Sequence, residues 1–162
     1  MAGMPGSGKS TLARALAATT AAVVLDKDVI QSSALRTGFE RELSGPLAYE
    51  VLFDLAAELA RQGHSIIADS AAFFPTIIEK GRRIAEENGF LYRVIECVCT
   101  RDLLQNRLSL RESRTSQWGA LLDIDLEARP GAEPLSIPRL IVDTALPLPC
   151  YLELALKYIN DG

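Results

Sequence analysis

Near its N-terminus the chain carries a run of glycines and polar residues whose chemistry is phosphate binding. Residues 3–10 read G-M-P-G-S-G-K-S and fit the pattern G-x-x-x-x-G-K-[ST]. Glycines let consecutive backbone N–H groups turn onto phosphate oxygens with no Cβ in the way. Lys9 supplies a compact positive charge for the β- and γ-phosphates, and the Ser10 hydroxyl suits Mg²⁺. The expected phosphate contacts are Gly3, Met4, Pro5, Gly6, Ser7, Gly8, Lys9, Ser10 and Thr11.

The helix expected from Thr11 to Ala18 would direct its positive N-terminal end at the same anion. Beyond this loop, two apolar strand-like runs end in carboxylates, which are Asp26 followed by Asp28 after the first run and Asp69 after the second. Ligands of parallel α/β sheets bind beyond the carboxyl ends of the strands. Phosphoryl transfer needs a metal ion to gather charge and an oxygen base to orient the incoming hydroxyl.

We therefore predict that Asp28 is the base and that Asp69 holds the Mg²⁺ shell through water, with Asp26 a candidate for either role. The alternative for each is a helix cap or a turn aspartate, and Asp28 in particular lies where a helix begins. Asp143 also ends a strand, where the structural interpretation is preferred.

Arg107, Arg111 and Arg114 follow one another at spacings of four and three, which places them on or near one helix face. Held over bound phosphates, Arg107 and Arg111 would neutralise charge that grows on the transferring group. Periodicity fades between residues 113 and 138, and we expect a lid that excludes water over about residues 107–137. The alternative is a solvated helix face beside an ordinary loop.

Strand-like and helix-like segments alternate along the whole chain. The expected strands span residues 21–25, 65–68, 92–98 and 139–143, and the expected helices span residues 11–18, 46–62, 76–88, 101–112 and 150–159. This alternation predicts a single α/β domain over residues 1–162, with a parallel sheet covered by helices on both faces in three layers.

The strand that should precede the phosphate loop is nearly missing, since only Met1 and Ala2 come before Gly3. That strand lies in the middle of such a sheet, and its loss would leave unpaired backbone groups on two neighbours. Either the recorded start is late or the strand is reduced to a stub. We expect the natural protein to begin roughly five to eight residues earlier, about the length of one strand.

Composition restricts the class of protein. The chain is 48% hydrophobic and 23% charged, which suits one domain with a core, and no apolar run approaches the length of a membrane span. The sequence opens on the glycine-rich loop rather than on a signal peptide, and its three cysteines do not make a disulfide framework. A net charge of −4 lacks the basic footprint of a nucleic-acid binder. We expect a cytoplasmic monomer or homodimer that does not bind a membrane.

Several pieces of the chain together resemble a known family. These pieces are GMPGSGKSTLA, VVLDKDVI, SIIADS, the pair Arg107 and Arg111, and LIVDTALPL. In this order they resemble the AAA-domain group of small P-loop kinases, which is similar to gluconate and shikimate kinases, chloramphenicol phosphotransferase, zeta-toxin-type kinases and the polynucleotide kinase domain. The resemblance covers nearly the whole chain.

The resemblance implies a P-loop NTPase fold, Asp28 as the base, a lid built from the arginines, and an adenine pocket lined by residues 144–147. The sequence departs from the group in its missing first strand. It also departs at Gln31, which stands where polynucleotide kinase-like members carry an arginine that grips the acceptor's phosphate. The second departure disfavours a nucleic-acid acceptor.

The sequence thus predicts a Mg²⁺-dependent enzyme that moves the γ-phosphate of ATP to a hydroxyl of a small-molecule acceptor. We expect the acceptor pocket along residues 30–49 and 70–75, where Phe73 and Phe74 favour an apolar or aromatic portion. Three alternatives stay open: a 5′-hydroxyl nucleic-acid kinase, a non-catalytic ATP sensor or ATPase switch that keeps Lys9 and Ser10 without depending on Asp28, and a degenerate fragment. The pattern identifies no particular acceptor.

Overall fold

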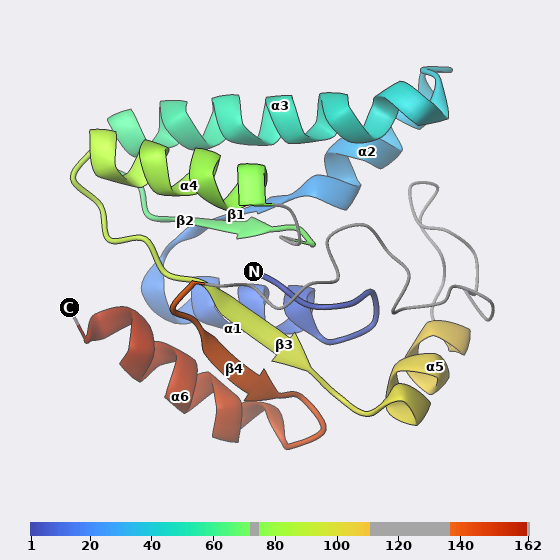
Figure 1. The fold of residues 1–162 in the computed structure, drawn as a ribbon, viewed down its shortest axis with the longest axis vertical. Helices are drawn as coiled ribbons and strands as arrows, with labels where there is room; N and C mark the ends of the chain where they lie inside the picture. The colour runs from blue at the N-terminus through green and yellow to red at the C-terminus, as the bar shows by residue number, and fades with distance from the viewer. Residues whose placement is uncertain (72–74, 111–136, 162) are drawn as a thin grey trace.

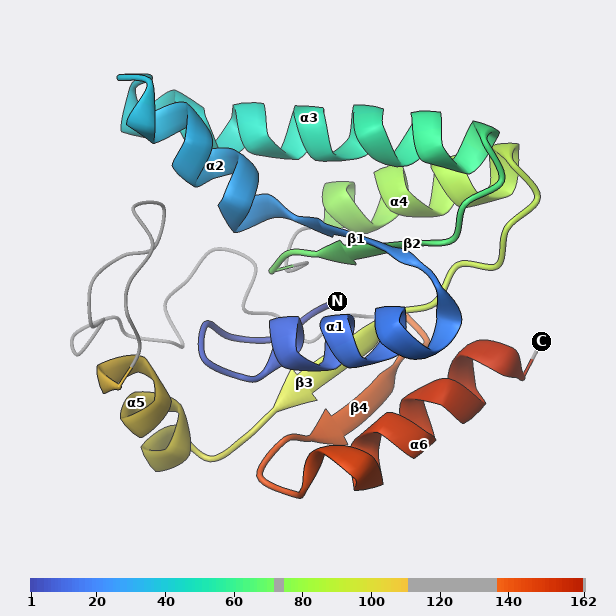
Figure 2. The same cartoon turned by 180° about the vertical axis from the view of Figure 1, so that it is seen from behind.

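The computed structural model of the chain describes residues 1–71, 75–110 and 137–161. Its elements are α1 (Lys9–Thr20), β1 (Val23–Asp26), α2 (Lys27–Arg36), α3 (Arg41–Arg61), β2 (Ile66–Asp69), α4 (Pro75–Glu87), β3 (Ile95–Val98), α5 (Arg101–Ser109), β4 (Leu140–Asp143) and α6 (Leu148–Asn160). In Figures 1 and 2, α3 and α4 lie on one side of β1 and β2, and α1 and α6 lie on the other. The expected α/β architecture with helices on both faces is confirmed.

The described strands form two parallel pairs. In the first pair, β1 runs beside β2 with Asp26 opposite Asp69, so both carboxylates stand at the same edge of the sheet. In the second pair, β3 runs beside β4 with Val98 opposite Asp143. Because all four strands point the same way, their carboxyl ends face one side of the molecule, where the expected ligand site lies.

The residues that precede the phosphate loop join the two pairs. Ala2 N–H donates to the Ile95 carbonyl over 2.8 Å, and Cys97 N–H donates to the Ala2 carbonyl over 2.9 Å. On the other side, the Met1 nitrogen donates to the Ala68 carbonyl over 2.8 Å. Residues 1–2 therefore occupy the central position between β2 and β3 that the sequence predicts for the strand before the loop.

Two helices differ from the sequence-based expectation. For α2 the sequence indicated only that a helix begins at Asp28 and gave no range, whereas the helix spans Lys27–Arg36. Helix α3 begins at Arg41 and not at Pro46, which lies inside it. The preceding turn is already helical, since Ser44 N–H donates to the Glu40 carbonyl over 2.9 Å. The start was expected where the regular apolar spacing begins, at Leu47 after Pro46, and this placed it about one turn too late.

A core between the second strand pair and two helices holds the loop in place. It gathers buried side chains of α1, α6, β3 and β4, namely Leu12, Leu16, Ile95, Cys97, Val142, Tyr151 and Ala155. Burial raises the pKa of the Cys97 thiol to about 11, so this cysteine is a core residue and not a thiolate ligand. Packing of α1 against this core fixes the helix that begins at the end of the phosphate loop.

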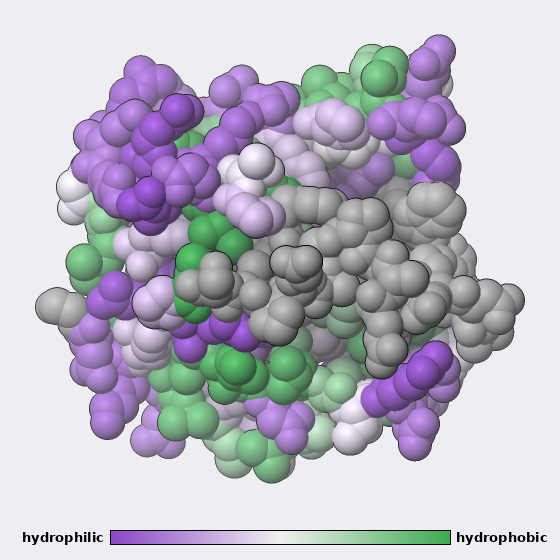
Figure 3. Space-filling model, in the orientation of Figure 1, coloured by the Kyte–Doolittle hydropathy of each residue, from purple (hydrophilic) through white to green (hydrophobic). Residues whose placement is uncertain are grey.

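The surface differs between the two halves of the molecule (Figure 3). Hydrophilic side chains gather over α3 and α4, whereas apolar surface gathers below them over β4 and α6. Ile141 on β4 and Leu154 on α6 are 53% and 52% exposed. Within the described ranges, no helix has both the length and the apolar character that crossing a membrane requires.

Candidate active site

The phosphate loop has the backbone that its glycines predict. Gly3, Gly6 and Gly8 have φ of 127°, 83° and 88°, a region that L side chains rarely adopt. Gly8 is the N-cap of α1, and no side chain caps this helix. The first N–H groups of α1 therefore face the end of the loop, where a helix N-terminus favours an anion.

Substituting Gly3 tests how closely the loop is fitted to the sheet. A Cβ at Gly3 would lie 2.3 Å from the Cys97 carbonyl oxygen, whereas a Cβ at Gly38, whose φ is also positive, meets nothing within 4 Å. We expect Gly38→Ala to cost about 1–2 kcal/mol of unfolding free energy. Gly3→Ala adds a clash with backbone to its strain and should cost at least about 3 kcal/mol. Urea unfolding of both variants measures the difference, and equal losses would contradict this packing.

Lys9 extends over the loop that it follows. Its Nζ donates to the carbonyl oxygens of Gly3 and Met4, each over 2.9 Å. The charges of Lys9 and Asp69 both act on the pKa of the Cys97 thiol, on which burial has the largest effect. The structure thus puts a cation in the loop and a buried carboxylate, Asp69, at the end of β2.

The strand-end carboxylates take different positions. Asp26 Oδ1 accepts hydrogen bonds from the N–H groups of Asp28 at 2.9 Å and Val29 at 3.4 Å, so Asp26 caps α2. Asp69, its neighbour across the sheet, is buried at the end of β2. The capping role that the sequence left open for Asp28 thus belongs to Asp26, and the Asp28 carboxylate lies in the first turn of α2.

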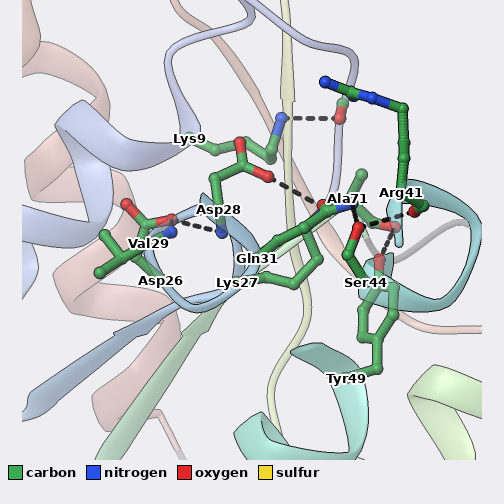
Figure 4. A network of polar contacts seen from close by, with 11 residues as sticks. Lys9, Asp26, Lys27, Asp28, Val29, Gln31, Arg41, Ser44, Tyr49 and Ala71 are labelled. Carbon is green, nitrogen blue, oxygen red and sulfur yellow. Dashed lines mark hydrogen bonds and ion pairs between the residues drawn. The ribbon is translucent and has the colours of Figure 1, made fainter. Parts of the chain in front are cut away.

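The Asp28 carboxylate is paired with the residue before it (Figure 4). Lys27 Nζ lies 3.0 Å from Asp28 Oδ1 and donates to Gln31 Oε1 over 2.7 Å. In the same view, Lys9 and Asp28 extend from α1 and α2 into one space. The Asp28 carboxylate is thus held at the start of α2 by an ion pair with its neighbour.

Gln31 continues this chain of contacts to α3. Its Nε2 donates to Ser44 Oγ over 3.0 Å, and Ser44 Oγ donates to the Arg41 carbonyl over 2.7 Å. Gln31 and Ser44 are both buried. Both polar ends of the Gln31 amide are therefore used inside the protein, where they join α2 to α3 behind the Asp28 carboxylate.

Tyr49 lies between Asp28 and the end of β2. Its hydroxyl donates to the Ala71 carbonyl over 3.4 Å, and its ring lies 5.7 Å from Lys27 Nζ. Burial and, second, the negative charge of Asp28 raise the pKa of Tyr49 to about 12, against the opposing effect of a hydrogen bond with Ser70. The sequence placed Tyr49 at the edge of the acceptor pocket, but nothing in the pattern paired it with Asp28.

The pKa of Tyr49 tests this placement. Asp28→Asn removes a negative charge that disfavours the phenolate, so the pKa of Tyr49 should fall below about 12. It should stay above the ordinary value because burial remains. Tyr92 is the internal control, since burial and Glu79 raise its pKa to about 12 and its titration should not change. An NMR titration of ring-labelled tyrosine follows both groups, and an unmoved Tyr49 would place Asp28 elsewhere.

Arg107 on α5 contacts the loop region directly. Its Nη1 donates to Thr144 Oγ1 over 2.9 Å and to the Gly6 carbonyl over 3.5 Å, and its Nη2 donates to the Thr144 carbonyl over 2.6 Å. Arg111, Arg114 and the expected lid beyond residue 110 lie outside the described residues. The contact with Thr144 was not foreseen, because no local pattern links positions so far apart in the chain.

The donors expected for Mg²⁺ fit a hard cation. Ser10 at the start of α1 and Asp69 at the end of β2 offer oxygen ligands at the sheet edge that also holds Lys9. Mg²⁺ uses one or two such protein oxygens and completes its shell with water and phosphate oxygens. In the part of the chain that the structure describes, no group of three or more His, Cys, Asp or Glu could hold a metal ion by itself.

Known structures share this fold. A candidate kinase from Chloroflexus aurantiacus is similar at 25% identity with a TM-score of 0.75, over 99% of this chain and 94% of that one. A sugar kinase from a Janibacter species is similar at 20% identity and a TM-score of 0.70, over 98% and 91% of the two chains. APS kinase of Mycobacterium tuberculosis, solved with AMPPNP and APS, is similar at 17% identity with a TM-score of 0.64, over 96% of this chain and 92% of that one.

The chain is also similar in sequence to mycobacterial proteins. Uncharacterised proteins of Mycobacterium bovis and Mycobacterium tuberculosis are 27% identical over 139 residues, which is 78% of this chain and 28% of theirs. The chain thus spans little more than a quarter of the length of these relatives. Residues 1–122 match the family described as AAA domain. The expected kinase-like P-loop fold is confirmed, and the chain belongs to the AAA-domain family.

Proposed function

We propose that this protein is an ATP-dependent phosphotransferase that moves the γ-phosphate of ATP to a hydroxyl of a small-molecule acceptor. The observation that carries the proposal is the meeting of a loop cation, a paired carboxylate and a buried carboxylate at one sheet edge. Lys9 comes from α1 and Asp28 from α2 (Figure 4), and Asp69 ends β2 opposite Asp26. A kinase needs these charges together, because phosphoryl transfer is achieved mainly by positioning and charge stabilisation.

In the proposed reaction, the loop N–H groups and Lys9 hold the β- and γ-phosphates. The acceptor oxygen forms a bond to the γ-phosphorus, the bond from that phosphorus to the bridging oxygen breaks, and ADP leaves with the electron pair. The proton of the acceptor hydroxyl passes to Asp28, whose carboxylate Lys27 Nζ holds in place at 3.0 Å. Ser10 and Asp69 would hold Mg²⁺, which would supply positive charge to neutralise the phosphates.

A small acceptor is supported over a nucleic acid. The Gln31 amide is hydrogen-bonded to Lys27 and Ser44, so it is not directed at a ligand phosphate. The net charge of −4 also opposes a polyanionic partner. A sugar kinase and APS kinase share the fold, and they support a hydroxyl acceptor and an ATP donor as the first classes to test.

A screen of hydroxylated compounds tests the proposal. ADP formation from ATP and Mg²⁺ is measured with sugars, nucleosides and hydroxylated antibiotics, with Lys9→Ala as the blank. We expect at least one compound to raise ADP formation above the rate without acceptor. Equal ATP turnover with and without every compound would favour an ATPase switch instead.

A further inference from the structure

The turn after β4 is joined to the phosphate loop by one side chain. Thr144 is buried, its N–H donates to the Val98 carbonyl over 2.9 Å, and its Oγ1 lies 2.9 Å from the Ser7 carbonyl and 3.2 Å from that of Val98. A hydroxyl has one proton to donate, and the shorter contact assigns it to Ser7. The β4–α6 turn is thus hydrogen-bonded to the backbone of a loop more than a hundred residues away in the chain.

Arg107 fixes Thr144 from the other side. Its guanidinium donates to both the hydroxyl and the carbonyl of Thr144, at 2.9 Å and 2.6 Å, and reaches the Gly6 carbonyl at 3.5 Å. We call Thr144 and Arg107, with the carbonyls of Gly6 and Ser7, the loop clamp. Each member of the clamp is in contact with at least one other, so the hydroxyl proton of Thr144 has a defined direction.

The clamp determines which way one loop peptide faces. A trans peptide is planar, and its C=O and N–H groups point in opposite directions. Because the Ser7 carbonyl faces Thr144, the Gly8 N–H faces away from it, into the loop. Ser7 Oγ is buried and has no hydrogen-bond partner among the described residues, so the loop does not fix this peptide with its own side chain.

Close packing supports the same conclusion. A Cβ on Gly8 would lie 3.2 Å from the Thr144 Cβ, so the turn already touches the loop backbone. We propose that Thr144 is a positioning residue for the phosphates of the nucleotide, acting through the Ser7–Gly8 peptide. This inference rests on the nucleotide-binding part of the proposed function. It differs from the sequence-based expectation for Thr144, which was a place in the adenine pocket.

Three probes separate these roles. Calorimetry measures the binding of ATP, of tripolyphosphate and of adenosine, with Mg²⁺ present throughout, to the whole chain and to Thr144→Val and Thr144→Ser. Valine keeps the shape and the charge of the site but removes the hydroxyl. We expect Thr144→Val to weaken ATP and tripolyphosphate alike by about fivefold to tenfold, the size of one hydrogen bond. Adenosine affinity should not change, and Thr144→Ser should restore both phosphate ligands.

Other outcomes overturn the inference. If Thr144→Val weakens the binding of ATP and adenosine but leaves tripolyphosphate affinity unchanged, Thr144 belongs to the adenine pocket. Unchanged affinities with a lowered melting temperature would make its role structural only. If Thr144→Val does not fold, Arg107→Lys serves instead, because it keeps the charge but loses the paired hydrogen bonds to Thr144. This variant should weaken the binding of ATP and tripolyphosphate. A wild-type chain that binds neither ATP nor tripolyphosphate would contradict the proposed function itself, and the inference with it.

Discussion

Replacing Asp28 by asparagine should lower the rate of phosphoryl transfer by at least about a hundredfold and leave ATP affinity nearly unchanged. A positioned base contributes about that factor or more, and an amide cannot accept the proton of the hydroxyl. Asparagine is close to aspartate in shape, and Asp28 lies on α2, outside the phosphate loop. The effect should therefore fall on turnover and not on nucleotide binding. Steady-state rates and ATP calorimetry on the same preparation measure both.

Asp143→Asn is the matched control for this substitution. Asp143 also ends a strand, and its Oδ1 accepts from Ala145 N–H over 2.9 Å, a contact that asparagine can keep. It should retain wild-type turnover. If Asp28→Asn keeps its activity while Asp69→Asn or Asp26→Asn abolishes it, the base has been assigned to the wrong carboxylate.

ATP with Mg²⁺ should stabilise the wild-type chain, and Lys9→Ala should abolish most of that stabilisation. A ligand that binds only the native state adds about 2.7 kcal/mol at a hundred times its dissociation constant. Lys9 Nζ lies on the loop carbonyls of Gly3 and Met4, so its loss removes the cation from the phosphate site. Thermal unfolding with and without millimolar ATP measures the shift.

Lys80→Ala provides the comparison, because Lys80 is a surface residue of α4 paired with Glu50. Its ATP-induced shift should equal that of the wild type. A folded wild-type sample that shows no shift would contradict nucleotide binding by the loop.

Local patterns were enough to predict the fold and the position of the phosphate loop. Glycine spacing fixed residues 3–10, and short apolar runs that end in aspartate marked β1 and β2. The parallel register of these strands then brings Asp26 and Asp69 side by side, as the rule for strand ends predicts. The sequence could not show which aspartate caps α2. Asp26 and Asp28 have the same side chain, and both lie at the start of the helix.

Contacts between distant parts of the chain could not be predicted. Arg107 was expected over the phosphates from its helical spacing, but its described contacts are with Thr144 and Gly6. The position of Tyr49 beside Asp28 depends on the packing of α2 against α3, which no single segment encodes. The roles of Arg107 and Arg111 over phosphates, the lid and the metal ligands stay predictions.

Transfer of a labelled γ-phosphate is the most direct test of the proposed activity. Wild-type protein is incubated with γ-labelled ATP, Mg²⁺ and the compound that raises ADP formation most, and the products are separated. We expect the label to appear in a phosphate ester of that compound, and we expect Asp28→Asn to lose this product. Label found only in inorganic phosphate, at the same rate with and without the compound, would contradict it.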